Sequence, residues 1–396
     1  MNAEIIAIGT ELTLGTTVDT NSAWLAGQLA TIGVAVSRVS LVGDDLPALT
    51  AMIGEAWARA ELVICTGGLG PTADDLTREA VAAATERPLE FHPDLFEQIA
   101  ARFRSFGRTM SESNRQQAYV PTGALAIPNA RGTAPVFIVS EPERALMVLP
   151  GVPSEMKFLA ETELLPFLRN ERGLKSILLV RSVYLSGTSE AEAGEAIADL
   201  MQAPYPTVGI SAKAAQYEVR ISALGEDRQQ VEADLAAVVA EVTRRLGRYI
   251  LNKAGLVAHV VHHLREQNQT LALYEGFREA PVYAALRRVP GGLQSVRGVT
   301  IHPLDEPVDA EAAESLARAA AAEVRNDWRA DYGLAVIPAQ VGADGYTDIC
   351  LVLTDRHGEQ SLCRRVDMAS SEAFGFIGNG ALEIVRRSLE TLQRQE

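Results

Sequence analysis

Short apolar runs alternate with amphipathic stretches over the first 70 residues of the chain, and this alternation constrains the fold more than any other feature. The apolar runs are EIIAIG, VAVSRVSLVG and ELVICTGG, and the amphipathic stretches between them cover residues 21–32 and 46–60. Short apolar runs predict buried strands, and amphipathic stretches predict helices. The order strand–helix–strand requires a crossover, so the pattern predicts a mainly parallel sheet with right-handed connections.

Each of these predicted strands ends in glycine, because Gly9, Gly43 and the pair Gly67-Gly68 follow the three apolar runs. In open α/β sheets the ligand crevice lies outside the carboxyl ends of the strands. The glycines therefore mark the edge of the sheet at which we expect a binding site.

The fold class predicted for the chain is α/β, in three domains. A length of 396 residues exceeds one ordinary domain of about 100 to 200 residues. An α/β domain is expected over residues 1–168, a small α+β domain over 169–252 and a second α/β domain over 253–396. The further predicted elements are helices at 76–84, 93–106, 189–201, 227–246, 309–328 and 374–394, and strands within VFIVS, RALMVLPG, KSILLVRSVYLSG, 207–224, GLAVIP and TDICLVLTD.

The composition excludes several classes of protein. Hydrophobic residues make up 47% of the chain and charged residues 22%, which argues against disordered, collagen-like and coiled-coil chains. A net charge of −15 disfavours direct binding to nucleic acid or to an anionic membrane, because such binding draws on clustered Lys and Arg. No apolar run approaches the roughly 20 residues that span a bilayer, and the N-terminus does not resemble a signal peptide. We therefore expect a cytoplasmic protein without a membrane partner.

The cysteines agree with a reducing compartment. Cys65, Cys350 and Cys363 are odd in number, far apart in the sequence and without C-x-x-C spacing. This pattern argues against a disulfide framework and against a zinc site.

The strongest local signal is the segment TGGLGPTADDLT at residues 66–77, which follows an apolar strand and precedes a predicted helix. Glycines let backbone N–H groups approach a phosphate, and a helix N-terminus adds partial positive charge. A structural alternative stays open, in which Thr72 caps the helix, Asp75 completes a capping pair and the glycines only turn the chain.

Acidic side chains beside this loop indicate a metal. Asp74 and Asp75 are unexpected if the loop alone holds phosphate, but they suit a site in which a divalent cation bridges carboxylate and phosphate. Glu11 and Asp19 follow the first predicted strand, so they should lie near the same sheet edge. Each is open to three interpretations: a metal ligand, a sugar-binding group or a helix cap.

Three further segments carry polar side chains: residues 114–124, 129–135 and 149–156. By composition alone the first two are surface loops with ordinary turn residues. The third is a helix entry, in which Glu155 complements the helix dipole.

Taken together and in this order, GTELTLG, DTNSAWLA, VGDD, TGGLGPTADDLT, NRQQAYVPTGA, NARGTAP and LPGVPSEMK resemble the competence/damage-inducible protein CinA family. The resemblance runs through about the first 165 residues and continues more weakly through SGTSEAEAGEAIADL and PTVGISAKAAQYEVRISA. One departure is Val136, where the family usually has glycine after GTAP, so we expect a different shape for that loop.

The resemblance implies a molybdopterin-binding-protein-like αβα sandwich that hydrolyses the pyrophosphate of ADP-ribose to AMP and ribose 5-phosphate, a reaction of NAD metabolism. It implies a divalent metal (Mg, Mn or Co), potassium and a homodimer. The residues implied to be catalytic are Asp74, Asp75 and Glu11, with Asp74 and Asp75 also at the metal. The residues implied to bind the nucleotide substrate are Asp19, Asn21, Thr66, Gly67, Gly68, Gly70, Thr72, Asn114, Gly151 and Glu155.

The third domain departs from the family. Many relatives carry a nicotinamide-mononucleotide deamidase there, with Ser-Cys-Thr-Gly-Gly after an Ala-Glu pair. This chain has YEGFREA at residues 274–280, so Gly276 stands where the serine nucleophile is expected. Without a hydroxyl no acyl or tetrahedral intermediate can form there. A Thr-Gly-x-Ala-Gly-Pro loop of the family reads IPAQVGA at residues 337–343.

We therefore predict a deamidase-like third domain without deamidase activity, serving dimerisation or ligand sensing. For the first domain the alternative is a non-catalytic module that binds a nucleotide or a pterin. The paired aspartates favour the hydrolase, because simple anion capture gains nothing from them. A role in DNA uptake is suggested only by the family name, and the acidic composition offers it no support.

Overall fold

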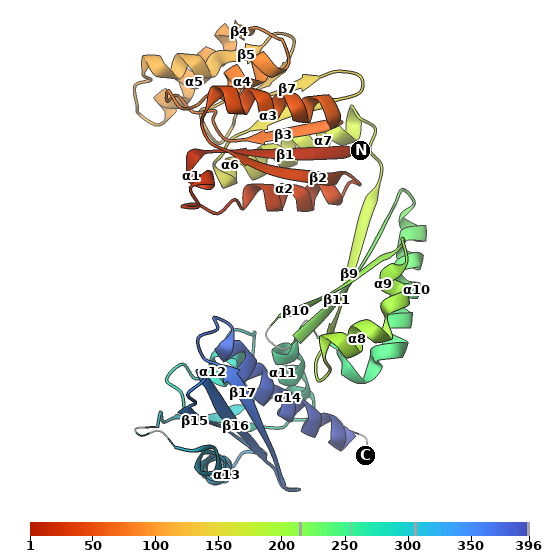
Figure 1. The fold of residues 1–396 in the computed structure, drawn as a ribbon, viewed down its shortest axis with the longest axis vertical. Coiled ribbons are helices and arrows are strands. Elements are labelled where there is room, and N and C mark those ends of the chain that lie inside the picture. Colours follow the sequence, from red (N-terminus) through yellow and green to blue (C-terminus); the bar gives the residue numbers. More distant parts are fainter. Residues whose placement is uncertain (214–215, 254, 305, 307, 394–396) are drawn as a thin grey trace. The chain divides into compact units, whose positions relative to one another are not determined.

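The computed structural model describes all residues except 214, 215, 254, 305, 307 and 394–396. The chain divides into two compact units. The first consists of Met1–Leu179 with Leu224–Val231, and the second of Val180–Ala223 with Glu232–Glu396. Helices and strands alternate in both (Figure 1), so the predicted α/β class is confirmed.

A six-stranded sheet in the order β2-β1-β3-β8-β7-β6 forms the centre of the first unit. Its strands are β1 (Asn2–Ile8), β2 (Ala35–Val42), β3 (Leu62–Thr66), β6 (Leu125–Ile127), β7 (Val136–Ser140) and β8 (Ala145–Leu149). The pairs β1–β2, β1–β3 and β3–β8 are parallel, and β7–β8 and β6–β7 are antiparallel. The sheet is mainly parallel, as the alternating pattern predicts.

Helices lie on both faces of this sheet (Figure 1), so that β3 and β8 are buried throughout. Leu25 and Leu29 project from one helix, and Leu49 and Ile53 from another, each pair at the helical spacing of four residues and fully buried. The helices are α1 (Thr10–Thr13), α2 (Asn21–Ala30), α3 (Leu46–Arg59), α4 (Thr77–Ala84), α5 (Pro93–Ser105), α6 (Pro153–Leu159) and α7 (Leu165–Asn170). The remaining elements are the strand pair β4 (Leu89–Phe91) and β5 (Tyr119–Pro121), the 3-10 helix η1 (Glu112–Ala118) and the π-helix η2 (Ala160–Leu164).

A four-stranded sheet in the order β10-β11-β9-β12 follows. Its elements are β9 (Ile177–Leu185), α8 (Glu190–Ala196), α9 (Ala198–Gln202), β10 (Thr207–Lys213), β11 (Gln216–Gly225), α10 (Arg228–Leu246), η3 (Gly247–Tyr249) and β12 (Ile250–Leu251). The single helix predicted at 189–201 is wrong, because the chain leaves the helical conformation at Ile197 (φ −122°, ψ 17°). Ile197 is fully buried, and Gly194 just before it is a weak helix former, so burial overrides helix continuity.

The last part of the chain forms a five-stranded sheet in the order β14-β13-β15-β16-β17. Its elements are α11 (Leu256–Glu266), β13 (Leu271–Glu275), α12 (Pro281–Arg287), β14 (Val296–Ile301), α13 (Ala310–Asp327), β15 (Tyr332–Val341), β16 (Tyr346–Thr354), β17 (Glu359–Asp367) and α14 (Ala373–Gln393). β13 runs parallel to β14 and β15, whereas β16 and β17 are antiparallel. In the described part of the chain, no helix is both long and apolar enough to cross a membrane.

The three cysteines are free thiols in different environments. Cys65 is fully buried in β3, and burial raises the pKa of its thiol to about 12. Cys350 and Cys363 lie opposite each other on the neighbouring strands β16 and β17, with 3.2 Å between their Sγ atoms, although they are far apart in the sequence. Burial, with the hydrogen bond to Cys363, raises the pKa of Cys350 to about 12. Cys363 itself is exposed.

We therefore expect iodoacetamide at pH 8 to alkylate Cys363 in the native protein, and Cys65 and Cys350 only after unfolding, because the thiolate is the reactive form. Peptide mapping by mass spectrometry measures this order. Cys363→Ser is the matched control and should leave the native protein nearly unlabelled. Rapid alkylation of Cys65 in the native protein would contradict the expectation.

Candidate functional site

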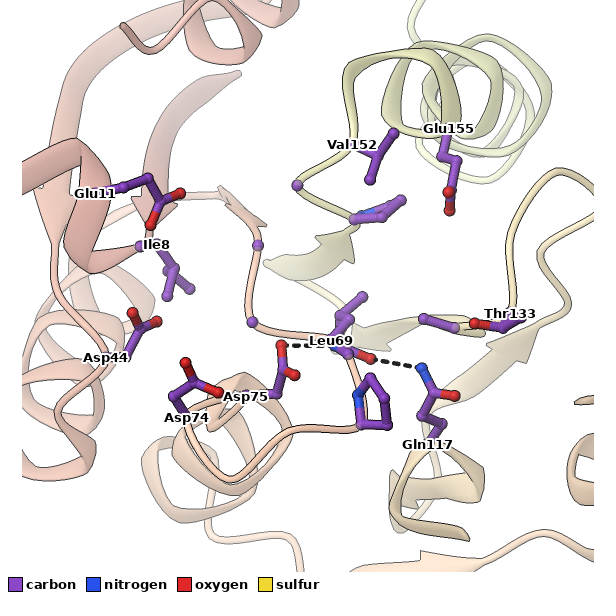
Figure 2. A pocket seen from close by; sticks show the side chains of 18 residues that line it. Ile8, Glu11, Asp44, Leu69, Asp74, Asp75, Gln117, Thr133, Val152 and Glu155 are labelled. Carbon is purple, nitrogen blue, oxygen red and sulfur yellow. Dashed lines mark hydrogen bonds between the residues drawn. The ribbon is translucent and has the colours of Figure 1, made fainter. Parts of the chain in front are cut away.

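A cavity of roughly 400 Å³ opens at the carboxyl ends of β1, β3 and β8 (Figure 2). It is lined by Ile8, Gly9, Glu11, Asp44, Gly67, Gly68, Leu69, Gly70, Pro71, Asp74, Asp75, Gln117, Thr133, Ala134, Pro150, Gly151, Val152 and Glu155. β1 pairs with β2 on one side and with β3 on the other, so the chain changes direction across the sheet there. Such a switch point is the usual ligand crevice of an open α/β sheet.

Eight of the residues implied by the resemblance line this cavity: Glu11, Gly67, Gly68, Gly70, Asp74, Asp75, Gly151 and Glu155. Four others lie behind its wall or beside it. Asn21 donates to the Gly151 carbonyl at 2.8 Å, and Asp19 accepts the Ser22 N–H at 3.0 Å. Thr66 is buried at the end of β3, and the buried Asn114 donates to Gln117 at 3.0 Å.

The cavity is acidic. Five carboxylates line it, and none of the residues described in its lining is basic. Four of them gather on one side in Figure 2, whereas Glu155 lies opposite, near Thr133. The four are Glu11, Asp44, Asp74 and Asp75. A concentrated negative charge of this kind attracts cations and repels a bare polyanion.

Asp75 is bound to the glycine-rich loop. Its Oδ1 accepts the Gly70 N–H at 2.7 Å, and its Oδ2 accepts the Thr72 N–H at 2.8 Å. The Thr72 hydroxyl donates to the same Oδ2 at 2.5 Å. The helix α4 begins only at Thr77, with Leu76 as its N-cap, so Thr72 does not cap the helix.

Asp74 is exposed at the cavity, and the pKa of its carboxyl group is shifted. The Thr72 hydroxyl, which can bond either Asp74 or Asp75, and the backbone N–H of Asp74 lower the pKa of Asp74 below the ordinary value for aspartate. Its carboxylate therefore stays ionised at neutral pH, as a cation ligand must.

Glycine is required where the loop leaves β3. Gly67 has φ +105°, and a Cβ there would lie 2.3 Å from the Ile8 carbonyl oxygen. Gly68 has φ +64°, and a Cβ there would lie 2.1 Å from the Thr77 hydroxyl oxygen. The loop thus packs directly on the end of β1, which places its backbone in the floor of the cavity.

Among the lining residues outside the set of candidates from the sequence, three have polar side chains: Asp44, Gln117 and Thr133. Asp44 closes the turn onto α1, because its Oδ2 accepts both the N–H and the hydroxyl of Thr10 at 2.8 Å. The signal for Asp44 was its position after the glycine that ends β2. Gln117 lies in η1 and follows no strand of the six-stranded sheet, so the rule that ligands bind at the carboxyl ends of the strands does not predict it.

The carboxylates fit only one kind of metal site. Among the described residues, no group of three or more His, Cys, Asp or Glu side chains is arranged to hold a metal ion. Asp75 already accepts three hydrogen bonds, and Asp74 is exposed. These residues do not fit a closed protein cage. They fit a magnesium-type site, in which one or two carboxylates hold the ion and substrate phosphates and water complete it.

Gly276 occupies the position at which the family resemblance leads us to expect a serine nucleophile. Gly276 follows β13 and donates to the Val336 carbonyl at 2.8 Å. A Cβ at Gly276 would lie 2.9 Å from Cδ of Pro338 and 3.2 Å from the Val336 oxygen. The preceding Glu275 is buried and accepts the Val282 N–H at the start of α12. This site therefore lacks both the hydroxyl and the space for a side chain.

Comparison with known proteins gives matches over most of the chain. Residues 4–170 match the family model "Probable molybdopterin binding domain", which confirms the fold predicted for the first domain. Residues 181–251 match the "Damage-inducible protein CinA KH domain". A solved structure, titled as the protein CinA with unknown function from Thermoplasma acidophilum, aligns with 40% of this chain and 94% of its own at 34% identity and a TM-score of 0.38.

Two curated relatives match over nearly their whole length. A CinA-like protein of Synechococcus sp. (strain CC9902) is 35% identical over 378 residues, which is 90% of each chain. A putative competence-damage inducible protein of Halothermothrix orenii is 34% identical over 363 residues, which is 88% of this chain and 87% of the relative. With the two family models, these matches show that the chain belongs to the CinA-like family.

Proposed function

We propose that the first domain is a metal-dependent hydrolase that cleaves the pyrophosphate of ADP-ribose, or of a related nucleotide diphosphate, to AMP and ribose 5-phosphate. The observation that carries the proposal is the cavity itself, in which five carboxylates and a glycine-rich loop meet at the carboxyl ends of parallel strands. The CinA resemblance supplies the substrate.

Charge explains why a metal is needed. Two like charges 4 Å apart repel by about 1 kcal/mol in water and by about 4 kcal/mol at the effective dielectric of a protein surface. A pyrophosphate group that meets five carboxylates would feel several such repulsions. Cations that bind together with it would offset this repulsion, which suits a divalent ion (Mg, Mn or Co) and potassium as further positive charge. When bound, the divalent ion would neutralise charge that develops on the phosphates.

In this proposal each residue of the site has a separate role in binding or catalysis. Asp74 and Asp75 hold the cation, and Glu11, on the same wall, accepts the proton of the attacking water as the bond between phosphorus and the bridging oxygen breaks. The loop from Gly67 to Thr72 faces the phosphates. Asn21 and Asn114 act from behind, because Asn21 fixes the Gly151 carbonyl and Asn114 fixes Gln117.

AMP release from ADP-ribose by the full-length protein tests the proposal. We expect turnover with magnesium, manganese or cobalt, stimulation by potassium, and no turnover with EDTA. Asp75→Ala should abolish it. Measurable nucleotide binding without turnover in any metal would instead favour the second candidate, a non-catalytic nucleotide- or pterin-binding module. This second candidate is supported by one observation: among the described residues, no three metal-ligating side chains form a cluster.

As the resemblance implies, we also propose a cytoplasmic homodimer, which sedimentation velocity would detect as a dimer.

The third domain is proposed to lack nicotinamide-mononucleotide deamidase activity, because Gly276 offers no nucleophile and Pro338 fills the space beside it. The purified protein should release no more ammonia from nicotinamide mononucleotide than a heat-killed sample does. A family member that retains the serine is the positive control, and ammonia above the heat-killed background would overturn the prediction.

A further inference from the structure

The glycine-rich loop is held by three side chains that bind its carbonyl oxygens. Arg78 of α4 donates to the Leu69 oxygen at 2.9 Å and to the Gly70 oxygen at 2.7 Å. Gln117 donates to the Leu69 oxygen at 3.2 Å. Gln116 donates to the oxygens of Gly70 and Thr72 at 3.3 and 3.0 Å. These contacts fix the direction of the loop backbone.

The bonds to the carbonyl oxygens fix the direction in which the N–H groups of the loop point. A trans peptide is planar, so its C=O and N–H point in opposite directions. The Leu69 carbonyl and the Gly70 N–H belong to one peptide. Arg78 and Gln117 hold the carbonyl end, and the N–H end points to Asp75. Gln116 holds the carbonyls on both sides of the peptide that carries the Thr72 N–H. The two N–H groups would therefore keep their direction without Asp75.

We propose that the N–H groups of Gly70 and Thr72 form a preformed anion-binding nest, and that the Asp75 carboxylate is its internal occupant, which a substrate phosphate replaces. This inference rests on the proposed function, because it takes the phosphate from that substrate. Each N–H has one proton to donate, and carboxylate and phosphate repel each other, so only one of them can use the nest at a time. The displaced Asp75 turns toward the cavity, where its free carboxylate meets the cation that arrives with the phosphate.

Arg78 is a positioning residue in this arrangement. It is 1% exposed, it contacts the loop only through carbonyl oxygens in the bonds described, and its guanidinium lies directly behind the nest. Burial lowers the pKa of the Arg78 guanidinium, and the charges of Glu79 and Asp75 oppose this shift. A buried positive charge at that place favours any anion in the nest, and a lysine could not span both carbonyls because it lacks the planar fork of arginine.

Calorimetric titration with inorganic pyrophosphate, in EDTA and without metal, tests the proposal on the full-length protein. Asp75→Ala removes the internal competitor and should bind pyrophosphate about tenfold more tightly than the wild type, since a charged hydrogen-bonded group must otherwise be displaced. Asp45→Ala is the control: Asp45 caps α3 and does not line the cavity, so this variant removes one negative charge but leaves the nest filled, and its affinity should change less than about threefold. Equal gains in both variants, or no gain in Asp75→Ala, would overturn the proposal.

Three further measurements test the alternative that the loop collapses without Asp75. Asp75→Asn keeps the shape of the side chain but loses its charge, and it should show a smaller gain of the same sign. In the Asp75→Ala background, Arg78→Lys should cancel the gain while thermal unfolding still reports a folded first unit. Amide NMR of the wild type should show the Gly70 and Thr72 resonances shifting with pyrophosphate. Resonances that stay in place at saturation would refute the nest. None of these readouts requires turnover, so they remain decisive if ADP-ribose is not hydrolysed.

Discussion

Asp74→Asn should reduce metal-dependent AMP release from ADP-ribose by about 10²- to 10³-fold, with little effect on folding. The asparagine keeps the size of the side chain but loses the negative charge that we propose to hold the cation. Asp74 is exposed, so the substitution disturbs no core packing. The loss should lie mainly in kcat/KM at fixed metal and should be partly recovered at high manganese, because a weakened ion site still fills by mass action.

Asp45→Asn is the matched control for this variant. Asp45 is exposed and caps α3 by accepting the Ala48 N–H at 3.0 Å, and it is not among the residues that line the cavity. Its substitution should leave AMP release unchanged. If Asp74→Asn retained full activity at every metal concentration, Asp74 would have no part in the site.

The pH dependence of the wild type follows from the direction of the Asp74 shift. Its pKa lies below the ordinary value for aspartate, so the carboxylate is ionised from neutral pH down to pH 5. Activity that requires this anion is lost only as the pH falls through the lowered pKa. An activity loss between pH 7 and 5 must then come from another group.

Glu383→Ala should lower the free energy of unfolding of the second unit by about 3–5 kcal/mol, because it removes the buried carboxylate that binds two of the three guanidinium nitrogens of Arg386. Glu383 and Arg386 lie in α14 and are each 4% exposed. Arg386 donates to Glu383 through Nε at 2.8 Å and through Nη2 at 2.7 Å. The buried Ser186 hydroxyl also donates to Glu383, at 2.7 Å. In the alanine variant Nε and Nη2 of Arg386 and this hydroxyl lose their acceptor, whereas Nη1 keeps its bond to Glu390 at 2.7 Å.

Urea denaturation followed by far-UV circular dichroism measures this loss. Glu314→Ala is the matched control, because Glu314 forms an ion pair with Arg318 at 2.6 Å on the surface of the same unit. A surface pair of this kind contributes about 0–1 kcal/mol. Equal losses in the two variants would show that the Glu383 pair is not the buried interaction described.

The same pair sets a pH dependence of stability. Burial raises the pKa of Glu383, but the hydrogen bonds and charge of Arg386 outweigh burial, so the pKa lies below the ordinary value for glutamate. The stabilisation is therefore complete above the pKa of an unfolded glutamate, about 4.3, and is lost as the pH falls through the lowered value. The difference between wild type and Glu383→Ala should narrow in that acidic range.

The parts of the fold that the sequence predicts well are those with a strong periodic pattern. Fully apolar β3 and amphipathic α3 are found where the pattern places them. The strand β17 escaped prediction, because its sequence EQSLCRRVD contains no apolar run. It lies at the edge of its sheet, where mostly exposed polar positions are tolerated and burial provides no signal.

The candidate site shows a similar division. The carboxyl ends of β1, β3 and β8 predict which loops meet, and Glu11, Asp75 and Gly151 all lie at the cavity. What each loop atom binds is not predictable from local sequence. The N–H groups of the glycine-rich loop meet an aspartate of the same loop, because distant side chains from η1 and from α4 set the direction of its peptides.

The close contact between Gly276 and Pro338 bears on how the third domain can change in future. A serine at position 276 would bring its Cβ to 2.9 Å from the ring of Pro338. This single substitution would therefore destabilise the fold before its hydroxyl could act as a nucleophile. A smaller residue at position 338 would make room beside Gly276 but, on its own, would supply no nucleophile. A serine at position 276 would therefore need a second change that makes room for its side chain, and until then the contact with Pro338 keeps glycine at this position.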